Sequence, residues 1–440
     1  MMSETETETV KASPFKEFFI SVITRDIRIV DTIPEFVDNS IDGANRIRDS
    51  DNLSGLYVAV DVNENEFSIT DNCGGIKKDI AKNYAFRFGR DEEAESVIES
   101  IIGKFGVGMK RSLFKLGRSF LIESKTEDVH YVIEINVDEW LERAEWEFEL
   151  EPISTDDRRA TLTEPGTRIV VTELDDHVSD KFSQELFVTK IINNLRIKNR
   201  QYLRDGIELS VNGDLLEYSP LELKTSENLT PASETFTVDK DGTEVQIRIQ
   251  VGVGERSPDR AGWYIFCNGR LVDEANKSGE TGWGTENIPQ YHNDYSRFRG
   301  MVDFRSNNPG VLPWNTSKTD INSDAQIFET ARQKMRQHMM DVLDYLKDIR
   351  KQKEEAGSSV LEQQIERAES RDVAELSASE DQSFSIRSEE EQQREEMANI
   401  HYSREKELVE EVQEELGVST YKAVGEKTFD YFYEFEMEGY

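Results

Sequence analysis

The segment EFVDNSIDGA, residues 35–44, decides how the first part of this chain is interpreted. It lies within residues 25–48, where apolar side chains recur at helical spacing, so we predict one amphipathic helix there despite a proline. Glu35 and Asn39 stand four residues apart, which places a carboxylate and a carboxamide on one helix face. A carboxylate can polarise water and an amide oxygen can coordinate Mg²⁺, although polar residues on such a face are ordinarily just solvated.

Three further segments follow in a fixed order. DNCGGI, residues 71–76, comes after a predicted strand, and there Asp71 could accept a hydrogen bond from an exocyclic amine while Gly75 lets a flat purine approach the backbone. A tight turn explains the same letters. GKFGVGMK, residues 103–110, precedes a predicted helix, so its amides together with Lys104 or Lys110 could hold phosphates, although it lacks P-loop spacing. PGT, residues 165–167, precedes another strand.

The four segments in this order resemble the Bergerat ATP-binding fold of the GHKL superfamily, which includes gyrase B, MutL, the MORC ATPases and the large heat-shock chaperones. The resemblance covers residues 25–173 and departs from the usual pattern once, because the first glycine of Asp-x-Gly-x-Gly is shifted or replaced in DNCGGI. The implied site residues are Glu35 as general base, Asn39 as Mg²⁺ ligand, Asp71 and Gly75 at adenine, Gly103, Lys104, Phe105, Gly106, Val107, Gly108 and Met109 at the phosphates, and Thr167 as a further nucleotide contact.

Residues 84–102 lie between the expected adenine and phosphate segments. In this superfamily the corresponding stretch is a lid that closes over ATP, and Gly89 is the expected hinge. A plain surface helix and loop explains the same residues equally well.

From about residue 183 the pattern predicts a second α/β unit, which begins with a helix followed by a strand near residues 206–211. Residues 264–272, YIFCNGRLV, resemble the strand-turn-strand of the transducer domain in MutL-like proteins, although Asn-Gly is also the commonest hairpin turn. PWNTSK, residues 313–318, sits where that domain places a lysine. The resemblance implies that Lys318 reaches the γ-phosphate and stabilises charge during transfer. A surface lysine after a turn is the alternative.

The composition limits the surroundings and partners of the chain. It has 440 residues, a formal net charge of −36, two cysteines and no apolar stretch near the roughly 20 residues that span a bilayer. We therefore expect a cytoplasmic protein that is neither exported nor bound to a membrane. Negative charge disfavours tight non-specific nucleic-acid binding over the whole surface, although a local basic groove would survive it.

We expect an α+β chain in five parts. The ATP-binding part should be an α/β sandwich with helices on one face of a sheet. Its strands should include a hairpin over residues 56–70 and a strand at residues 146–150. The charged residues after residue 326 should form helices that do not pack into a globular core. The parts are an acidic flexible N-terminus (1–14), the ATP-binding domain (15–180), the transducer domain (181–325), a charged helical or coiled-coil arm (326–415) and an aromatic docking segment (416–440).

The pattern most resembles compact prokaryotic MORC-like or chaperone-like ATPases, since no histidine has a convincing phosphoacceptor context and 440 residues leave no room for a topoisomerase cleavage domain. The resemblance implies a slow Mg²⁺-dependent ATPase that works as an ATP-gated homodimeric clamp or remodelling factor, in a process such as DNA repair or phage defence. The alternative is a slow nucleotide sensor or regulatory subunit that recruits a co-encoded effector through residues 326–440.

Overall fold

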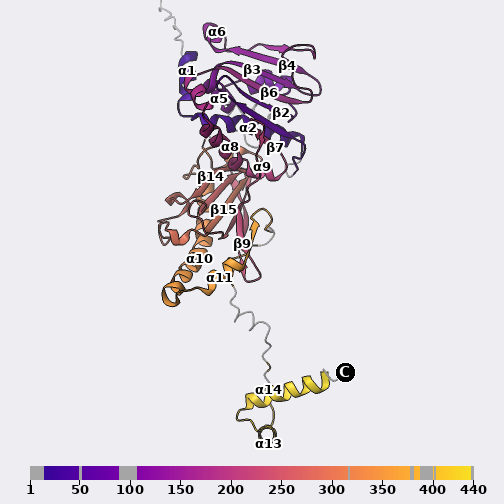
Figure 1. Ribbon diagram of the computed structural model, residues 1–440, viewed down its shortest axis with the longest axis vertical. Coiled ribbons are helices and arrows are strands. Elements are labelled where there is room, and N and C mark those ends of the chain that lie inside the picture. Colours follow the sequence, from indigo (N-terminus) through magenta and orange to yellow (C-terminus); the bar gives the residue numbers. More distant parts are fainter. Residues whose placement is uncertain are drawn as a thin grey trace, which may run out of the picture. The chain divides into compact units, whose positions relative to one another are not determined.

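The computed structural model describes residues 14–48, 52–88, 107–315, 318–376, 381–386, 400 and 403–437. The chain divides into two compact units, Met1–Ile386 and Arg387–Tyr440. The larger unit contains two large sheets and two two-stranded sheets, and the smaller unit contains helices (Figure 1). The observed mixture of helices and sheets is the α+β class that the sequence predicts.

An eight-stranded sheet organises the first part of the larger unit, in the order β5-β4-β3-β6-β2-β1-β7-β8. The predicted hairpin of residues 56–70 is present, with β1 antiparallel to β2. The predicted strand at residues 146–150 is wrong except at its end, because Trp146 lies outside the sheet and packs edge-on against Phe19 and Trp140. The strands are β1 (Tyr57–Val62), β2 (Phe67–Asp71), β3 (Gly117–Lys125), β4 (His130–Asn136), β5 (Leu150–Pro152), β6 (Gly166–Leu174), β7 (Glu208–Val211) and β8 (Asp214–Leu215).

Helix α2 (Ile29–Ile47) carries the segment that decides the fold. Its apolar side chains form one buried stripe, and Phe36 packs against Phe67 of β2 with ring centroids 4.9 Å apart. The helix begins at Ile29 rather than near residue 25, because Arg28 has extended backbone angles and a separate helix, α1 (Lys16–Arg25), precedes it. The remaining helices of this part are α3 (Lys78–Ile80), the π-helical turn η1 (Ala81–Ala85), α5 (Gly108–Leu116), α6 (Val137–Glu142), α7 (Asp176–Phe182), α8 (Glu185–Lys198) and α9 (Arg200–Arg204).

The strand predicted at residues 206–211 belongs to the first sheet and not to the second unit. It is β7, which pairs in parallel with β1 and buries Leu209 and Val211. Alternating apolar residues predict a strand but not its sheet, because partner choice depends on tertiary packing.

A five-stranded sheet forms the second part of the larger unit, in the order β11-β12-β15-β13-β14. The predicted hairpin turn between β13 and β14 is confirmed, since Asn268 and Gly269 both have positive φ, 48° and 81°, as a type I′ turn requires. The strands are β11 (Ala232–Lys240), β12 (Thr243–Val253), β13 (Gly262–Cys267), β14 (Arg270–Asn276) and β15 (Phe298–Arg305).

Helix α10 (Gln326–Ala356) corrects the expectation of a free charged arm. Its buried residues, among them Phe328, Met335 and Met339 at 0% exposed, recur at helical spacing and pack on β12 and β15. Charged residues on the other faces of α10 make its overall composition polar, so composition alone does not reveal the buried stripe. Helix α11 (Val360–Arg367) follows, and then β16 (Glu369–Asp372) pairs with β9 (Glu222–Thr225) and β17 (Ser385–Ile386) pairs with β10 (Leu229–Thr230).

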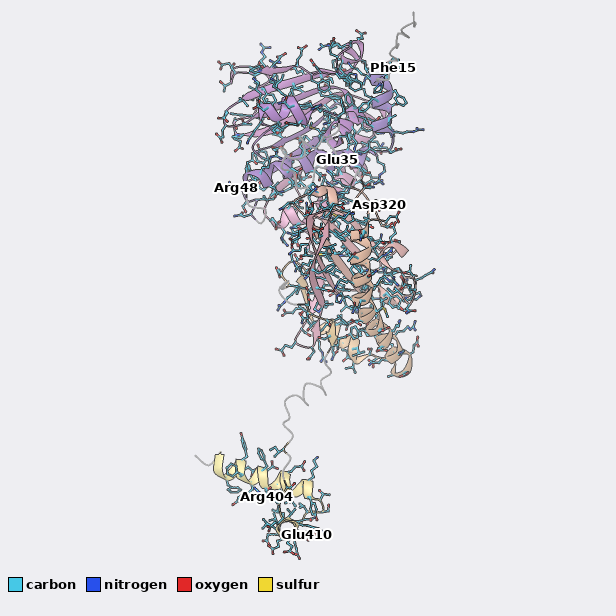
Figure 2. All side chains as sticks on the ribbon, turned by 180° about the vertical axis from the view of Figure 1, so that it is seen from behind. Phe15, Glu35, Arg48, Asp320, Arg404 and Glu410 are labelled. Atoms are coloured by element: carbon cyan, nitrogen blue, oxygen red, sulfur yellow. The ribbon has the colours of Figure 1, made fainter. Side chains whose placement is uncertain are left out.

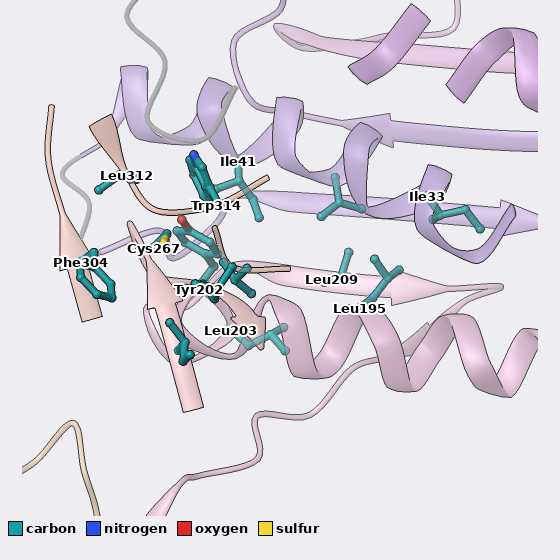
Figure 3. Packing of buried hydrophobic residues seen from close by; sticks show 14 of the residues in the cluster. Ile33, Ile41, Leu195, Tyr202, Leu203, Leu209, Cys267, Phe304, Leu312 and Trp314 are labelled. Carbon is teal, nitrogen blue, oxygen red and sulfur yellow. The ribbon is translucent and has the colours of Figure 1, made fainter. Parts of the chain in front are cut away.

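One continuous cluster of buried side chains joins the two sheets. Figure 3 shows Ile33 and Ile41 of α2 in the same packed layer as Leu209 of β7 and Cys267 of β13. The Tyr202 hydroxyl of α9 donates a hydrogen bond to the carbonyl oxygen of Asn268 in the second sheet's hairpin turn. Because they share a core, the two sheets hold a fixed relation within the larger unit.

The smaller unit consists of α13 (Lys406–Leu416), α14 (Tyr421–Phe432) and the π-helical turn η5 (Tyr433–Met437). Within its described residues only Val424 is a buried hydrophobic side chain. The aromatic side chains that the sequence marks for docking lie 52–63% exposed, at Phe429, Tyr431, Phe432, Tyr433 and Phe435. No helix in the described parts of either unit has the length and apolar character needed to cross a membrane.

Candidate functional site

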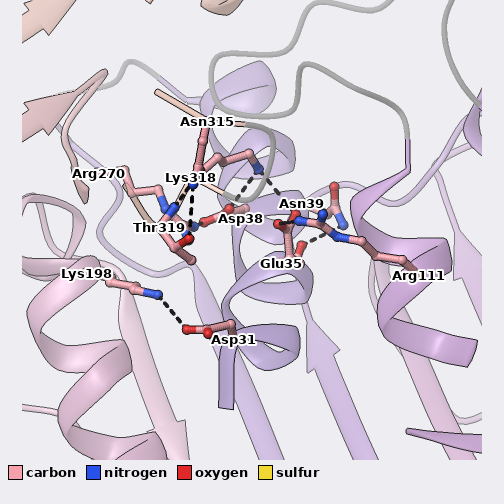
Figure 4. Close-up of polar contacts among 10 residues, drawn as sticks. All are labelled: Asp31, Glu35, Asp38, Asn39, Arg111, Lys198, Arg270, Asn315, Lys318 and Thr319. Atoms are coloured by element: carbon pink, nitrogen blue, oxygen red, sulfur yellow. Dashed lines mark hydrogen bonds and ion pairs between the residues drawn. The ribbon is translucent and has the colours of Figure 1, made fainter. Parts of the chain in front are cut away.

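Glu35 lies near the junction of the two sheet-containing parts (Figure 2). Its side chain is only 3% exposed. One carboxylate oxygen accepts a hydrogen bond from Arg111 Nη2 of α5 at 2.6 Å, and the other lies 3.4 Å from Lys318 Nζ. Figure 4 shows these side chains converging from three segments on one turn of α2. The structure therefore brings together two of the predicted residues, Glu35 and Lys318.

The start of α5 lies directly against this carboxylate. A Cβ atom added at Gly108 would meet Glu35 Oε2 at 2.1 Å, so no larger residue fits there without movement. Val107 precedes it as the N-cap residue of α5. Lys110, one of two lysines considered for the phosphates, donates instead to the carbonyl of Ala85 at 2.8 Å. Gly103, Lys104, Phe105, Gly106 and the expected hinge Gly89 lie outside the described residues.

The surrounding charges keep Glu35 ionised. Burial raises the pKa of this carboxyl group, but the nearby positive charges of Lys318, Arg111 and Arg270 outweigh burial, so the pKa lies below its usual range. Burial also lowers the pKa of Lys318, and Glu35 opposes that effect. The site is thus a buried ion cluster whose charges depend on one another.

Contacts of the described residues on both sides of Lys318 hold it near α2. The Trp314 indole nitrogen donates to the carbonyl of Pro309 at 3.0 Å, and Trp314 forms a β-bridge with Ile321. The backbone amide of Lys318 donates to the carbonyl of Asn315 at 3.0 Å. Lys318 itself has φ of 52°, a left-handed conformation that is uncommon for a side-chain-bearing residue. A lysine that is 4% exposed does not fit the surface-lysine alternative.

Asp71, at the end of β2, accepts three hydrogen bonds. They come from the Ser40 hydroxyl at 2.6 Å, from the Cys73 amide at 2.9 Å and from the Thr167 amide at 3.1 Å. Burial nonetheless raises the pKa of Asp71 above its ordinary value. The contact with Thr167 follows from sheet register, because Asp71 of β2 stands opposite Thr167 of β6.

Glycine is required where the backbones cross beside Asp71. Gly75 has φ of 69°, and a Cβ there would lie 2.1 Å from the carbonyl oxygen of Lys125. A Cβ at Gly166 would lie 1.9 Å from the carbonyl oxygen of Asp71. Gly74 also has positive φ, so the altered DNCGGI segment still turns through two left-handed residues and places Gly75 in the close crossing.

A cavity of about 40 Å³ connects the expected nucleotide residues. Ligand pockets commonly measure about 300–1,000 Å³, so this cavity must widen to admit a purine nucleotide. Its lining contains five of the predicted contacts, namely Asn39, Asp71, Gly75, Met109 and Thr167.

The donor set around Asn39 fits a magnesium ion that arrives with phosphates. The Asn39 amide nitrogen donates to the backbone carbonyl of Glu35 at 2.8 Å, so the side-chain oxygen is the atom of Asn39 that could coordinate the ion. No cluster of three or more His, Cys, Asp or Glu side chains among the described residues could hold a metal ion. Mg²⁺ ordinarily uses one or two protein oxygens and completes its shell with phosphates and water, so a single carboxamide suits it.

Three residues of the ion cluster were not assigned roles from the sequence. Arg111 follows the glycine-rich segment, Asp38 lies inside EFVDNSIDGA, and Arg270 lies inside YIFCNGRLV. Asp38 Oδ2 accepts from Lys318 Nζ at 2.9 Å, and Asp38 also forms an ion pair with Arg270. Their motifs were recognised, but spacing along the chain does not predict which distant charges meet.

In a comparison with known protein families, one family matches the first part of the larger unit. The family described as "Histidine kinase-, DNA gyrase B-, and HSP90-like ATPase" matches residues 28–166, from the residue before α2 to the first residue of β6. The matched region contains Glu35, Asn39, Asp71, Gly75 and the glycine-rich segment. No curated protein matches the chain significantly.

Proposed function

We propose that this chain, whose residues 28–166 form an ATP-binding domain of the GHKL superfamily, is a Mg²⁺-dependent ATPase with Glu35 as its general base and Lys318 as its charge-stabilising lysine. One observation carries the proposal. Lys318 Nζ lies 3.4 Å from Glu35 Oε2 although 283 residues separate them in sequence. A chain that only bound nucleotide would not need both groups at one point.

Each group has a defined task in the proposed reaction. The ionised carboxylate of Glu35 accepts a proton from the attacking water. The ammonium of Lys318 approaches the γ-phosphate and stabilises the charge that develops on its oxygens. Asn39 would hold Mg²⁺ together with the phosphates, and the ion would supply further charge neutralisation. Asp71 accepts from the adenine amine, while Gly75 allows the base to lie against the backbone.

The proposed action is that of an ATP-gated homodimeric clamp or remodelling factor, with DNA repair and phage defence as candidate processes. Lys318 supports a gated mechanism because it belongs to the segment that follows the second sheet, whereas Glu35 belongs to the first part. The γ-phosphate would therefore contact both parts at once. A co-encoded protein could bind the exposed aromatic side chains of the smaller unit.

A slow nucleotide sensor is the second candidate function. The feature that favours it is the pairing of Glu35 with both Arg111 and Lys318, because a base held by two cations is a weak proton acceptor. The exposed aromatic residues of α14 and η5 would then recruit an effector when nucleotide binds.

Phosphate release by the purified full chain separates these functions. With Mg²⁺ and ATP we expect steady turnover that a chelator abolishes. Glu35→Ala should bind ATP as the parent does but lose about 10²–10⁴-fold in rate, because a general base contributes mainly to the transition state. The exposed Glu64→Ala is the matched control and should turn over normally. Equal rates in parent and Glu35→Ala would remove Glu35 from the mechanism, and binding without turnover in the parent would favour the sensor.

A further inference from the structure

Helix α2 presents a row of carboxylates to cations from distant segments. Asp31, Glu35 and Asp38 lie three or four residues apart, so they share one face of the helix, and all three are buried. Lys198 of α8 lies 3.3 Å from Asp31, while Lys318 contacts both Glu35 and Asp38. Figure 4 shows this row and its partners.

Asp38 is the carboxylate of this row that contacts both Arg270 and Lys318. One of its oxygens pairs with Arg270 of β14 and the other accepts from Lys318 at 2.9 Å. The distance from Lys318 to Glu35 is longer, 3.4 Å, so Asp38 is the closer carboxylate. The side chains of Asp38 and Arg270 are each 1% exposed, so this ion pair is shielded from solvent. Arg270 thus fixes Asp38, and Asp38 in turn fixes the ammonium of Lys318.

We propose that Asp38 is the positioning residue for Lys318, and that the Asp38–Arg270 ion pair fixes how far the lysine of the second part extends toward the ATP site of the first. Asp38 touches neither phosphate nor water in the proposed reaction, since its two oxygens are occupied by cations. Its effect on the reaction passes through Lys318 alone. This inference rests on the proposed role of Lys318 in ATP hydrolysis.

The neighbouring Asp31 provides a matched control. It belongs to the same buried row and pairs with a lysine from another helix, but its partners are Lys198 of α8 and Arg28 rather than Lys318. Asp31→Asn and Asp38→Asn therefore each remove one buried charge from α2 without changing side-chain volume. Only Asp38→Asn should affect Lys318.

The first experiment needs no ATP turnover. The folded full chain is treated briefly with an amine-acetylating reagent, and the acetylation rate of each lysine is measured by mass spectrometry. Lys318 is 4% exposed and should react slowly in the parent. We expect Asp38→Asn to accelerate acetylation of Lys318 about tenfold without affecting Lys198. Asp31→Asn should accelerate acetylation of Lys198 without affecting Lys318. Parental reactivity of Lys318 in Asp38→Asn would overturn the proposal.

The second experiment uses phosphate release. Asp38→Asn should lower kcat to the level of Lys318→Ala and leave the KM for ATP within about threefold of the parent value. The double variant Asp38→Asn/Lys318→Ala should have the same kcat as Lys318→Ala alone. Asp38→Glu should restore part of the rate, and Arg270→Lys serves as a milder test if Asp38→Asn does not fold. Additive losses in the double variant would overturn the proposal. If the parent shows no turnover, the proposed hydrolysis fails, and the acetylation result still decides whether Asp38 positions Lys318.

Discussion

At the scale of single residues, the site depends on charges and close contacts that lie far apart in sequence. Asp71 keeps its place because three hydrogen bonds and two crossing backbones surround it. Its carboxylate still lines the cavity and has lone pairs left for a ligand. Which nucleobase binds there therefore depends on whether the base presents a hydrogen-bond donor or an acceptor to the Asp71 carboxylate.

We predict that the chain prefers ATP to GTP through Asp71. Adenine presents an amine to this acceptor, whereas guanine presents a carbonyl, and two facing acceptors leave both groups unpaired at a cost of roughly 1–3 kcal/mol. The affinity for GTP should therefore be about 5- to 150-fold weaker. Calorimetry with both nucleotides measures the difference. Asp71→Asn, which offers a donor as well as an acceptor, should narrow it, and equal affinities in the parent would reject the adenine assignment.

At the scale of elements, local pattern predicted α2, α5 and most strands, because their apolar residues recur at the period of the element they form. It failed where tertiary partners decide. The strand β7 joined the first sheet, and α10 joined the core despite its charge. At the site, motif order predicted Glu35, Asp71 and Lys318, whereas Asp38 and Arg270 needed the fold, since their pairing spans 232 residues by their numbers.

The packing of α10 leads to a prediction on stability. Met335 is 0% exposed on the helix face that covers the second sheet, and Met340 on the same helix is 40% exposed. Met335→Ala should lower the free energy of unfolding of the larger unit by about 2–5 kcal/mol, because it removes buried volume and leaves a cavity. Met340→Ala should change it by no more than about 0.5 kcal/mol. Denaturant unfolding of the full chain measures both changes in the free energy of unfolding. If Met335→Ala changed it as little as Met340→Ala, the result would support a free arm over α10.

At the scale of the whole molecule, the two sheets of the larger unit share one core, so ATP cannot act by bringing two independent domains of one chain together. Part of the predicted charged arm, residues 326–356, is packed into that unit and is therefore not a free element that could join two chains. The proposed assembly would therefore use the surface around the ATP site or the exposed aromatic side chains of the smaller unit. In the proposed clamp, nucleotide binding would act directly on the surface around the ATP site.

The final prediction is that a non-hydrolysable ATP analogue with Mg²⁺ drives two ATP-binding domains to associate, whereas ADP does not. Only the triphosphate offers a γ-phosphate to Lys318, and a ligand shifts an equilibrium only by its different affinities for the two states. Light and X-ray scattering of the full chain should show a doubled mass only when the analogue is present, and not with ADP or without nucleotide. If the smaller unit already holds a dimer, the mass will stay constant and the radius of gyration will fall.

Lys318→Ala is the control for this measurement. It removes the group that distinguishes the two nucleotides, so the analogue should then behave as ADP does, while binding through Asp71 and the glycines persists. The same mass and radius for the parent without nucleotide, with ADP and with the analogue would contradict the clamp. A response that survives in Lys318→Ala would instead place the trigger in the residues that cover the nucleotide, because Lys318 would then have no part in sensing the γ-phosphate.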